Sequence, residues 1–368
     1  MNNCVGIINL DGNERKMGEL VVNRTLASVP IAARYRIIDF VLSNMTNSGI
    51  DSIGIFTKNK SRSLIDHLTN GKPWDLNRKK DGLRVFNFSE YDPSFEDVHT
   101  FAENVEFLKF SHKEYVLLAP SYMICNINYE EVIADHIKSG KDVTIVYKKI
   151  KQPDSSFQEC NVLNFGDLGD VISIGENVGH GNNLNISMEM YVLKTNTFID
   201  IVNECITNGM YRKVKEYIND NLDKLRVGGY EFKGYLQCIS SLKALYDANL
   251  SLLNRKVSKE IFSEERPIFT KIKDEAPTRY TKESKVVNSM IANGCYIKGS
   301  VENCVIGRRV YIGEGVKLKN CVIMQNSSIG DNSILDNVIA DKGTEIKADE
   351  KLMGSDLYPL FIEKRKTI

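Results

Sequence analysis

The chain has 368 residues, which is enough for two domains of ordinary size with separate hydrophobic cores. Its 48 basic and 48 acidic residues give a formal net charge of zero, which argues against nucleic acid or an anionic membrane as the main partner. No apolar run approaches the length of a membrane helix, and the first apolar run, Val5–Ile8, lacks the flanks of a signal peptide. The eight cysteines form no CxxC pair, so we expect reduced, mostly buried thiols and a cytoplasmic location.

Residues 1–255 alternate strand-like apolar runs with helix-like segments. The expected strands are Val5–Ile8, Ser52–Phe56, Tyr115–Ala119, Asp142–Tyr147 and Met188–Val192, and the expected helices are Ile37–Ser48, Tyr129–Ser139 and Thr195–Thr207. This alternation predicts an α/β domain with a mostly parallel sheet that is covered on both faces. Ligands bind such sheets beyond the carboxyl ends of the strands, so we expect any chemistry in the loops after Ile8 and Ala119.

The C-terminal part shows a period of six residues. Aliphatic side chains recur at Ile306, Ile312 and Leu318, and again at Ile323, Ile329 and Leu335. This period is neither helical nor alternating, and it suits a triangular coil in which each side takes one inward aliphatic side chain. We predict a left-handed parallel β-helix of three to four coils at 286–368, after a linker at 256–285; an ordinary antiparallel β domain is the alternative. Asparagines tolerate the left-handed backbone of tight turns, and they fall between the aliphatic positions at Asn303, Asn320, Asn326 and Asn337.

Three segments carry a resemblance to a known family. Residues 34–40 read R-Y-R-I-I-D-F and continue with L-S-N at 42–44 and N-S-G-I at 47–50. This block resembles the (K/R)-(F/Y)-R-I-I-D-F…L-S-N…N-S-G-I block of the glucose-1-phosphate adenylyltransferases. Residues 186–191 read I-S-M-E-M-Y, where the family has A-S-M-G-I-Y, and V-Y-I-G-E-G at 310–315 is also similar. The resemblance implies a Rossmann-like (GT-A-like) nucleotidyltransferase domain followed by a β-helix of hexapeptide repeats.

The first loop departs from the family. The family's loop reads A-G-G-x-G-x-R-L, and its glycines allow backbone N–H groups to approach the nucleotide phosphates. Residues 10–17 here read L-D-G-N-E-R-K-M, so Asp11 and Glu14 replace two glycines while Gly12 remains. An acid beside a triphosphate is repulsive, and a side chain blocks close approach of the backbone. We therefore expect the phosphate-binding geometry of this loop to be lost.

The positions that resemble the family's metal and sugar-phosphate ligands have also changed. The aspartates that would hold Mg²⁺ fall on Ser121 and Cys238, and the lysines near glucose 1-phosphate fall on Leu26 and Asn177. Nucleotidyl transfer without Mg²⁺ loses the main stabilisation of the developing phosphate charge. We expect no metal and no cofactor on this chain, and we expect the chain to be inactive on its own. Gly12 and Ser187 match family positions near the nucleotide and the sugar, and they are candidate remnants of a substrate pocket.

This pattern resembles the non-catalytic GlgD-type subunits of bacterial glucose-1-phosphate adenylyltransferase. The resemblance implies a heterotetramer with a catalytic GlgC-type subunit, or a homo-oligomer alone. The catalytic partner would carry Mg²⁺ and make ADP-glucose and diphosphate from ATP and glucose 1-phosphate in glycogen biosynthesis. Arg24 and Arg36 match positions where the family has basic residues near its effector site, so they are candidates for binding a phosphorylated metabolite; surface ion pairing is the plainer interpretation.

Two other functions remain open from the sequence. The first is an active Mg²⁺-dependent enzyme with a rearranged site, in which Asp11 or Asp97 would hold the metal. The second is a β-helix acyltransferase or scaffold. An acyltransferase would need a histidine in or near the coils, and the last of the five histidines is His180, well before them.

Overall fold

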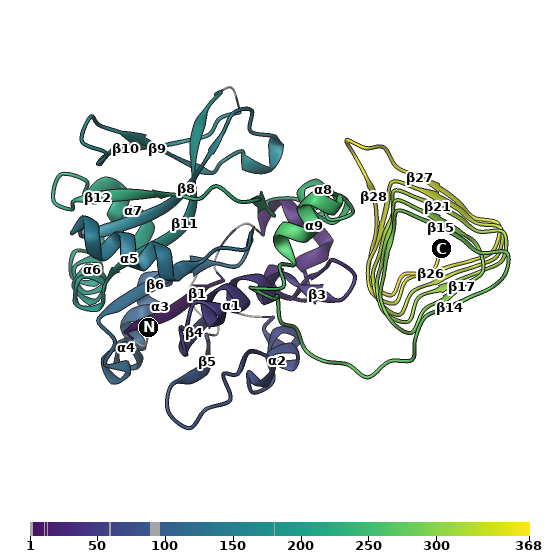
Figure 1. The fold of residues 1–368 in the computed structure, drawn as a ribbon, viewed down its shortest axis with the longest axis horizontal. Coiled ribbons are helices and arrows are strands. Elements are labelled where there is room, and N and C mark those ends of the chain that lie inside the picture. Colours follow the sequence, from purple (N-terminus) through teal and green to yellow (C-terminus); the bar gives the residue numbers. More distant parts are fainter. Residues whose placement is uncertain (1–2, 11, 13, 59, 89–95, 180) are drawn as a thin grey trace.

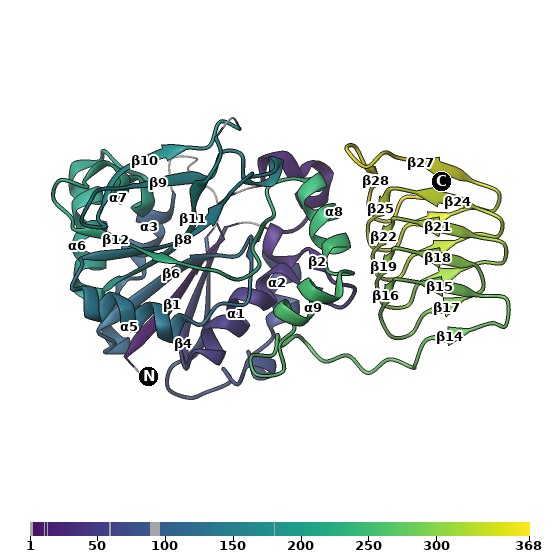
Figure 2. The same ribbon diagram turned by 45° about the horizontal axis from the view of Figure 1, so that its top comes forward.

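The computed structural model describes residues 3–10, 12, 14–58, 60–88, 96–179 and 181–368. An α/β domain and a triangular β-helix stand side by side, and a chain segment runs between them along one end of the β-helix (Figures 1 and 2). None of the described helices is long and apolar enough to cross a bilayer.

The α/β domain is built on a mixed, mostly parallel nine-stranded sheet. Its path is β10-β9-β11-β6-β1-β4-β5, with β8 paired to β11 and to β12. Strands β6, β1, β4 and β5 are parallel neighbours, while β11 runs antiparallel to β6 and β8. All five predicted strands are present, and β8 and β11 extend several residues further than predicted. The strands are β1 (Cys4–Asn9), β4 (Ser52–Thr57), β5 (Gly82–Asn87), β6 (Tyr115–Pro120), β8 (Val143–Ile150), β9 (Asn161–Phe165), β10 (Val171–Glu176), β11 (Leu184–Lys194) and β12 (Val227–Glu231).

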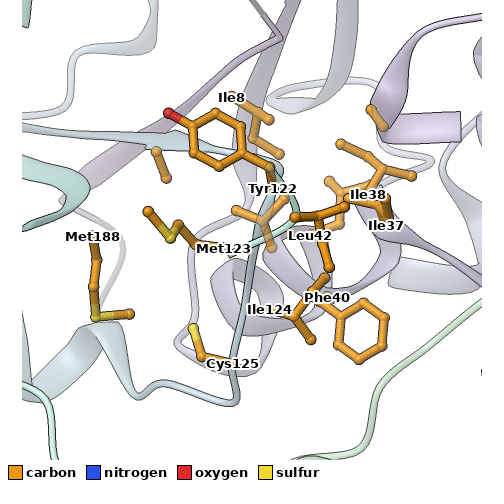
Figure 3. Close-up of a cluster of buried hydrophobic side chains, with 14 of the residues drawn as sticks. Ile8, Ile37, Ile38, Phe40, Leu42, Tyr122, Met123, Ile124, Cys125 and Met188 are labelled. Atoms are coloured by element: carbon orange, nitrogen blue, oxygen red, sulfur yellow. The ribbon is translucent and has the colours of Figure 1, made fainter. Parts of the chain in front are cut away.

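Helices cover both faces of this sheet, as predicted. Alternate residues of β1 enter two separate cores, because successive side chains of a strand point to opposite faces: Ile8 packs in one core and Ile7 in the other. Figure 3 shows the first core, where Ile8 lies among side chains of α1 and of the segment that follows β6. The helices are α1 (Ile37–Asn47), α2 (Arg62–Leu68), α3 (Asp97–Glu103), α4 (Val105–Ser111), α5 (Tyr129–Ser139), α6 (Thr195–Asn208), α7 (Val214–Asp220), α8 (Leu242–Ser251) and α9 (Arg255–Ile261).

The β-helix has three flat faces, each a parallel five-stranded sheet. The first face has β14 (Arg279–Tyr280), β17 (Tyr296–Ile297), β20 (Tyr311–Ile312), β23 (Ser328–Ile329) and β26 (Glu345–Ile346). The second has β15 (Lys285–Val287), β18 (Ser300–Glu302), β21 (Lys317–Lys319), β24 (Ile334–Asp336) and β27 (Lys351–Met353). The third has β16 (Met290–Ile291), β19 (Val305–Ile306), β22 (Val322–Ile323), β25 (Val338–Ala340) and β28 (Leu360–Ile362).

The repeat predicted from six-residue spacing is confirmed. Leu318 and Leu335 are register partners on adjacent coils, and both are buried in the core of the β-helix. All four predicted turn asparagines have a positive φ, between 50° and 62°. Each face has five strands, however, so the helix has more coils than the three to four predicted. The first strand, β14, lies in the segment predicted as linker. The six-residue pattern does not reveal this strand, because Tyr280 stands where later coils have an aliphatic residue.

The two domains share a packed and hydrogen-bonded junction. Val322, Met324 and Ile339 of the β-helix belong to the same buried cluster as the core beneath α1. The hydroxyl of Tyr246, on α8, donates to the carbonyl of Asn320 at 2.9 Å. The guanidinium of Arg24 forms an ion pair with the carboxylate of Asp341 at 2.7 Å, and both side chains are almost fully buried. The junction therefore fixes how the domains sit against each other.

Removal of one partner of this buried ion pair should destabilise the protein strongly. Arg24→Met leaves the carboxylate of Asp341 buried without its cation, which typically costs about 3–5 kcal/mol. We expect a loss of that order in the free energy of unfolding, measured by urea denaturation.

A surface ion pair supplies the control for this prediction. Arg226 pairs with Asp142 while its side chain stays 68% exposed, so Arg226→Met should cost at most about 1 kcal/mol. Addition of Asp341→Leu to Arg24→Met should recover part of the loss, because no unpaired charge then remains buried. Equal losses for Arg24→Met and Arg226→Met would contradict the role given to the buried pair.

Candidate functional site

A cleft opens beyond the carboxyl ends of β1 and β6, where the sequence predicted that ligands would bind. Its inner part, beside Asn9, Pro120 and Tyr191, holds only about 30 Å³, which is roughly the room for one water molecule. Its outer part holds about 490 Å³ and is bordered by Gly12 and Ser240. A sugar phosphate or nucleotide therefore finds room in the outer part but not in the inner part.

Three side chains close the inner cleft. The hydroxyl of Tyr122 donates to one carboxylate oxygen of Glu189 at 2.6 Å. The ammonium of Lys215, at the start of α7, contacts both carboxylate oxygens of Glu189 at 3.1 Å. Burial first and then the Glu189 carboxylate raise the pKa of Tyr122 well above its usual 10, so its hydroxyl stays protonated and can donate. In Figure 3 this hydroxyl points away from the apolar cluster that holds the ring.

The backbone of Glu189 is unusual. Its φ is +53°, in the left-handed region that a residue with a side chain seldom adopts. The register between β11 and β8 shifts between Ser187 and Met190, so Glu189 lies in an irregularity of the strand. Ser187 is buried, and its hydroxyl accepts the backbone N–H of Glu189 at 3.1 Å. Ser187, predicted as a remnant of the sugar pocket, thus supports the turn that presents Glu189.

The first loop lies along the outer cleft. Gly12 borders this cleft, and a Cβ at its position would lie 3.3 Å from the ring of Tyr122. Glu14 also borders it, and its carboxylate accepts the backbone N–H of Leu26 at 2.8 Å. The acid at this position is therefore part of the loop's own structure. Asp11, the other predicted acid, lies outside the described residues.

The positions that would hold Mg²⁺ do not form a metal site. Ser121 is buried, and the Cys238 thiol is fully buried with its sulfur 3.8 Å from that of Cys160. The hydrogen bond with Cys160 and burial raise the pKa of Cys238 well above its usual 9, so it stays a neutral thiol, and a metal ligand must be a thiolate. Asp97, the alternative metal ligand, is 6% exposed and accepts from the side chain of Asn9 and the backbone of Val214, each at 3.0 Å. Among the described residues, no group of three His, Cys, Asp or Glu could hold a metal ion.

The two positions expected to contact glucose 1-phosphate have structural roles. Asn177 is buried, and its amide donates to the carbonyl of Phe157 at 2.8 Å and accepts from the backbone of Gly179 at 3.0 Å. Leu26 packs in the core that contains α1. Neither side chain is placed to bind an anion in the cleft.

The predicted effector residues lie elsewhere, at the junction between the domains. Arg36 donates to the carbonyl and hydroxyl of Ser63, and Arg24 pairs with Asp341. Burial lowers the pKa of Arg36 to about 10; Asp39 opposes this shift, and Arg24 adds to it. Surface ion pairing does not describe Arg24, which is 3% exposed and whose second terminal nitrogen, Nη1, has no hydrogen-bond partner in the described part of the chain.

A cluster of cations surrounds this pair. Burial and then Arg36 and Arg24 lower the pKa of Lys342 from 10.5 to about 6, although Asp341 opposes them. Burial and then Arg308 and Arg36 lower the pKa of Lys273. We call Arg24, Arg36, Lys273, Arg308 and Lys342 the junction cluster. Several cations gathered in one place can attract an anion.

The junction cluster should make stability depend on pH. The folded-state pKa of Lys342, about 6, lies below the unfolded value of 10.5. Between these values the unfolded chain binds more protons, so this residue makes the fold more stable as pH rises through that window. Lys342→Met should flatten the rise of the thermal midpoint between about pH 6 and pH 8, measured by differential scanning fluorimetry in a buffer without multivalent anions.

Lys347 provides the matched control, because it lies on the same β-helix with an exposed side chain. The Lys347→Met variant should keep the pH dependence of the unmodified chain. A Lys342→Met variant with the same slope as that chain would show that Lys342 is not the group that titrates.

Sequence reasoning missed the three residues that close the cleft. Tyr122 and Lys215 lie in segments without a recognisable motif. Glu189 carried a signal that was not used: it stands where the resembling motif A-S-M-G-I-Y has a glycine. A glycine position filled by an acid, at the edge of a ligand cleft, indicates a side chain that enters the cleft.

Comparisons with known proteins agree with this architecture. A family model described as nucleotidyl transferase matches residues 15–255, and one described as GlmU-like, C-terminal hexapeptide, matches 274–358. The chain is 34% identical to the glycogen biosynthesis protein GlgD of Bacillus subtilis (strain 168), over 99% of this chain and 96% of that protein. It is 36% identical to GlgD of Geobacillus stearothermophilus, over 85% of this chain and 82% of that protein. A glucose-1-phosphate adenylyltransferase of Bacillus cytotoxicus is 28% identical over 95% of this chain and 94% of its own length.

Proposed function

Because this chain belongs to the nucleotidyl transferase family and is similar over nearly its whole length to proteins named GlgD, we propose that it is a non-catalytic regulatory subunit in glycogen biosynthesis. It supports the synthesis of ADP-glucose and diphosphate from ATP and glucose 1-phosphate by a catalytic partner. The observation that carries this proposal is the closed inner cleft, in which Glu189 is paired with Tyr122 and Lys215.

The same cleft argues against chemistry on this chain. Phosphoryl and nucleotidyl transfer depend on positioned positive charge around the phosphates, and Mg²⁺ usually supplies much of it. The candidate metal ligands here are a buried serine, a neutral thiol and Asp97, whose carboxylate already accepts two hydrogen bonds. These residues do not fit a magnesium ion, so no catalytic step is assigned to them.

The partner in this proposal is a catalytic subunit of the glucose-1-phosphate adenylyltransferase type, joined to this chain in a heterotetramer. The partner carries Mg²⁺ and the substrates, and this chain needs no cofactor. A subunit without chemistry can still act, because it shifts the partner's conformational equilibrium by the difference in its affinity for the partner's two states. The eight free, buried cysteines suit a reducing compartment, so we place the complex in the cytoplasm.

The regulatory ligand in this proposal is a phosphorylated metabolite that binds at the junction cluster. Arg36 and Lys342 come from different domains, so an anion between them would bind tightly only when the domains are docked as they are here. Such an anion would offset the mutual repulsion of the cations and favour the charged form of Lys342. This arrangement would connect metabolite binding to the geometry of the whole subunit.

The function is tested with three samples: this chain alone, the catalytic subunit alone, and the two co-expressed. We expect no ADP-glucose from this chain with ATP, glucose 1-phosphate and Mg²⁺. We expect a higher rate or a changed effector response in the co-expressed complex. Turnover by this chain alone would favour an active enzyme with a rearranged site. An unchanged rate and unchanged effector response in the complex would contradict the regulatory role.

The effector site is tested with inorganic phosphate as the probe. Phosphate should raise the thermal midpoint of the unmodified chain, because a ligand that binds only the folded state stabilises it. The rise should be at least halved in Lys342→Met, because this variant loses one charge contact worth about 1 kcal/mol. It should be unchanged in the control Lys347→Met. Equal rises in all three proteins would place the anion elsewhere.

A further inference from the structure

The inner cleft holds an anion that belongs to the chain itself. The carboxylate of Glu189 accepts the Tyr122 hydroxyl at 2.6 Å and receives both contacts from Lys215 at 3.1 Å. Its side chain is only 14% exposed, so these are contacts of a largely desolvated acid. A tyrosine hydroxyl and a lysine ammonium that converge on one acid are the kind of donor set that also binds a phosphate or carboxylate ligand.

We propose that Glu189 is an internal ligand that occupies a latent phosphate site formed by Tyr122 and Lys215, and that it keeps this cleft from binding sugar phosphates. This inference rests on the proposed non-catalytic function and goes further, because it assigns the occupant of the site. In this interpretation Tyr122 and Lys215 are the donors of the site, and the carboxylate of Glu189 satisfies both.

The backbone at Glu189 supports this assignment. A glutamate with φ of +53° is strained, and such strain persists only where the surroundings hold it in place. Here the Glu189 side chain is held by Tyr122 and Lys215, and its backbone N–H by Ser187. A glycine adopts this conformation without strain, so Glu189→Gly is compatible with the local backbone.

Space and charge point to the same ligand class. The outer cleft already offers about 490 Å³, and the inner cavity of about 30 Å³ would grow once the glutamate side chain is gone. Lys213 borders both hollows and forms an ion pair with Glu96 at 3.2 Å, while Lys16 at the rim pairs with Glu159 at 2.7 Å. Lys213 and Lys16 are thus already paired. Glu189→Gly would free two donors, Tyr122 and Lys215, and a single phosphate group can accept from both.

The experiment is isothermal titration of glucose 1-phosphate into the full-length chain, with glucose as the neutral control. The unmodified chain should bind glucose 1-phosphate only weakly, in the outer cleft, because Glu189 fills the inner site. Glu189→Gly should bind it more tightly by about tenfold or more, which corresponds to about 1.4 kcal/mol. Glucose should bind neither protein detectably, because the site recognises the phosphate.

Two further variants separate the role of the side chain from a general loosening of the cleft. Glu189→Gly combined with Lys215→Met should lose the gain, because the phosphate then has no cation. Glu189→Gln keeps the bulk of the side chain and removes its charge, so it should bind less tightly than Glu189→Gly. Circular dichroism and a thermal melt of each variant check that it is folded.

The outcomes are distinct from those of the functional test. A folded Glu189→Gly variant that binds no better than the unmodified chain overturns the internal-ligand proposal and leaves the regulatory function standing. A gain that survives Lys215→Met also overturns it, because the phosphate would then sit elsewhere. Failure of the proposed function would appear instead as turnover by this chain alone, a readout that the titration does not involve.

Discussion

The buried ion pair between Arg24 and Asp341 is the interaction on which the two-domain arrangement depends. It joins residues 317 positions apart in the sequence, and it lies where water is excluded. A buried charge is tolerated only when it is paired, so the pair holds the β-helix to the α/β domain in one orientation. The apolar contacts of Val322 and Ile339 reinforce the same orientation.

The inner cleft and the junction differ in how their charges are compensated. In the inner cleft Glu189 pairs with Lys215, and at the rim Lys16 pairs with Glu159, so these acids and bases neutralise each other within the chain. At the junction Arg24, Arg36 and Lys342 lie close together, and burial first and then the two arginines lower the pKa of Lys342. The donors of the inner cleft are already satisfied by Glu189, whereas the clustered cations of the junction would be stabilised by an anion. This contrast is why we assign the regulatory ligand to the junction and no substrate to the cleft.

In the proposed function, the fold offers a physical route to regulation without chemistry. An anion at the junction would touch both domains, so its binding would favour one relative orientation of the sheet and the β-helix. A partner that contacts both domains would sense that preference through the difference in contact free energy between its states. The nucleotidyl transferase scaffold would then serve as a rigid frame, and its former ligand cleft would be stabilised by its own side chains.

The sequence by itself determined the features that depend on local pattern. The α/β alternation, the six-residue repeat and the asparagine turns follow from the backbone period and turn chemistry of neighbouring residues, and the changed positions at Ser121, Asn177 and Cys238 could be read from motifs. The first coil at Tyr280 broke the repeat and was missed for that reason. Only the tertiary structure decided that Glu189 fills the cleft and that Arg24 faces Asp341. These pairs form between segments distant in sequence, and no local pattern records which side chains meet when a sheet and a β-helix pack together.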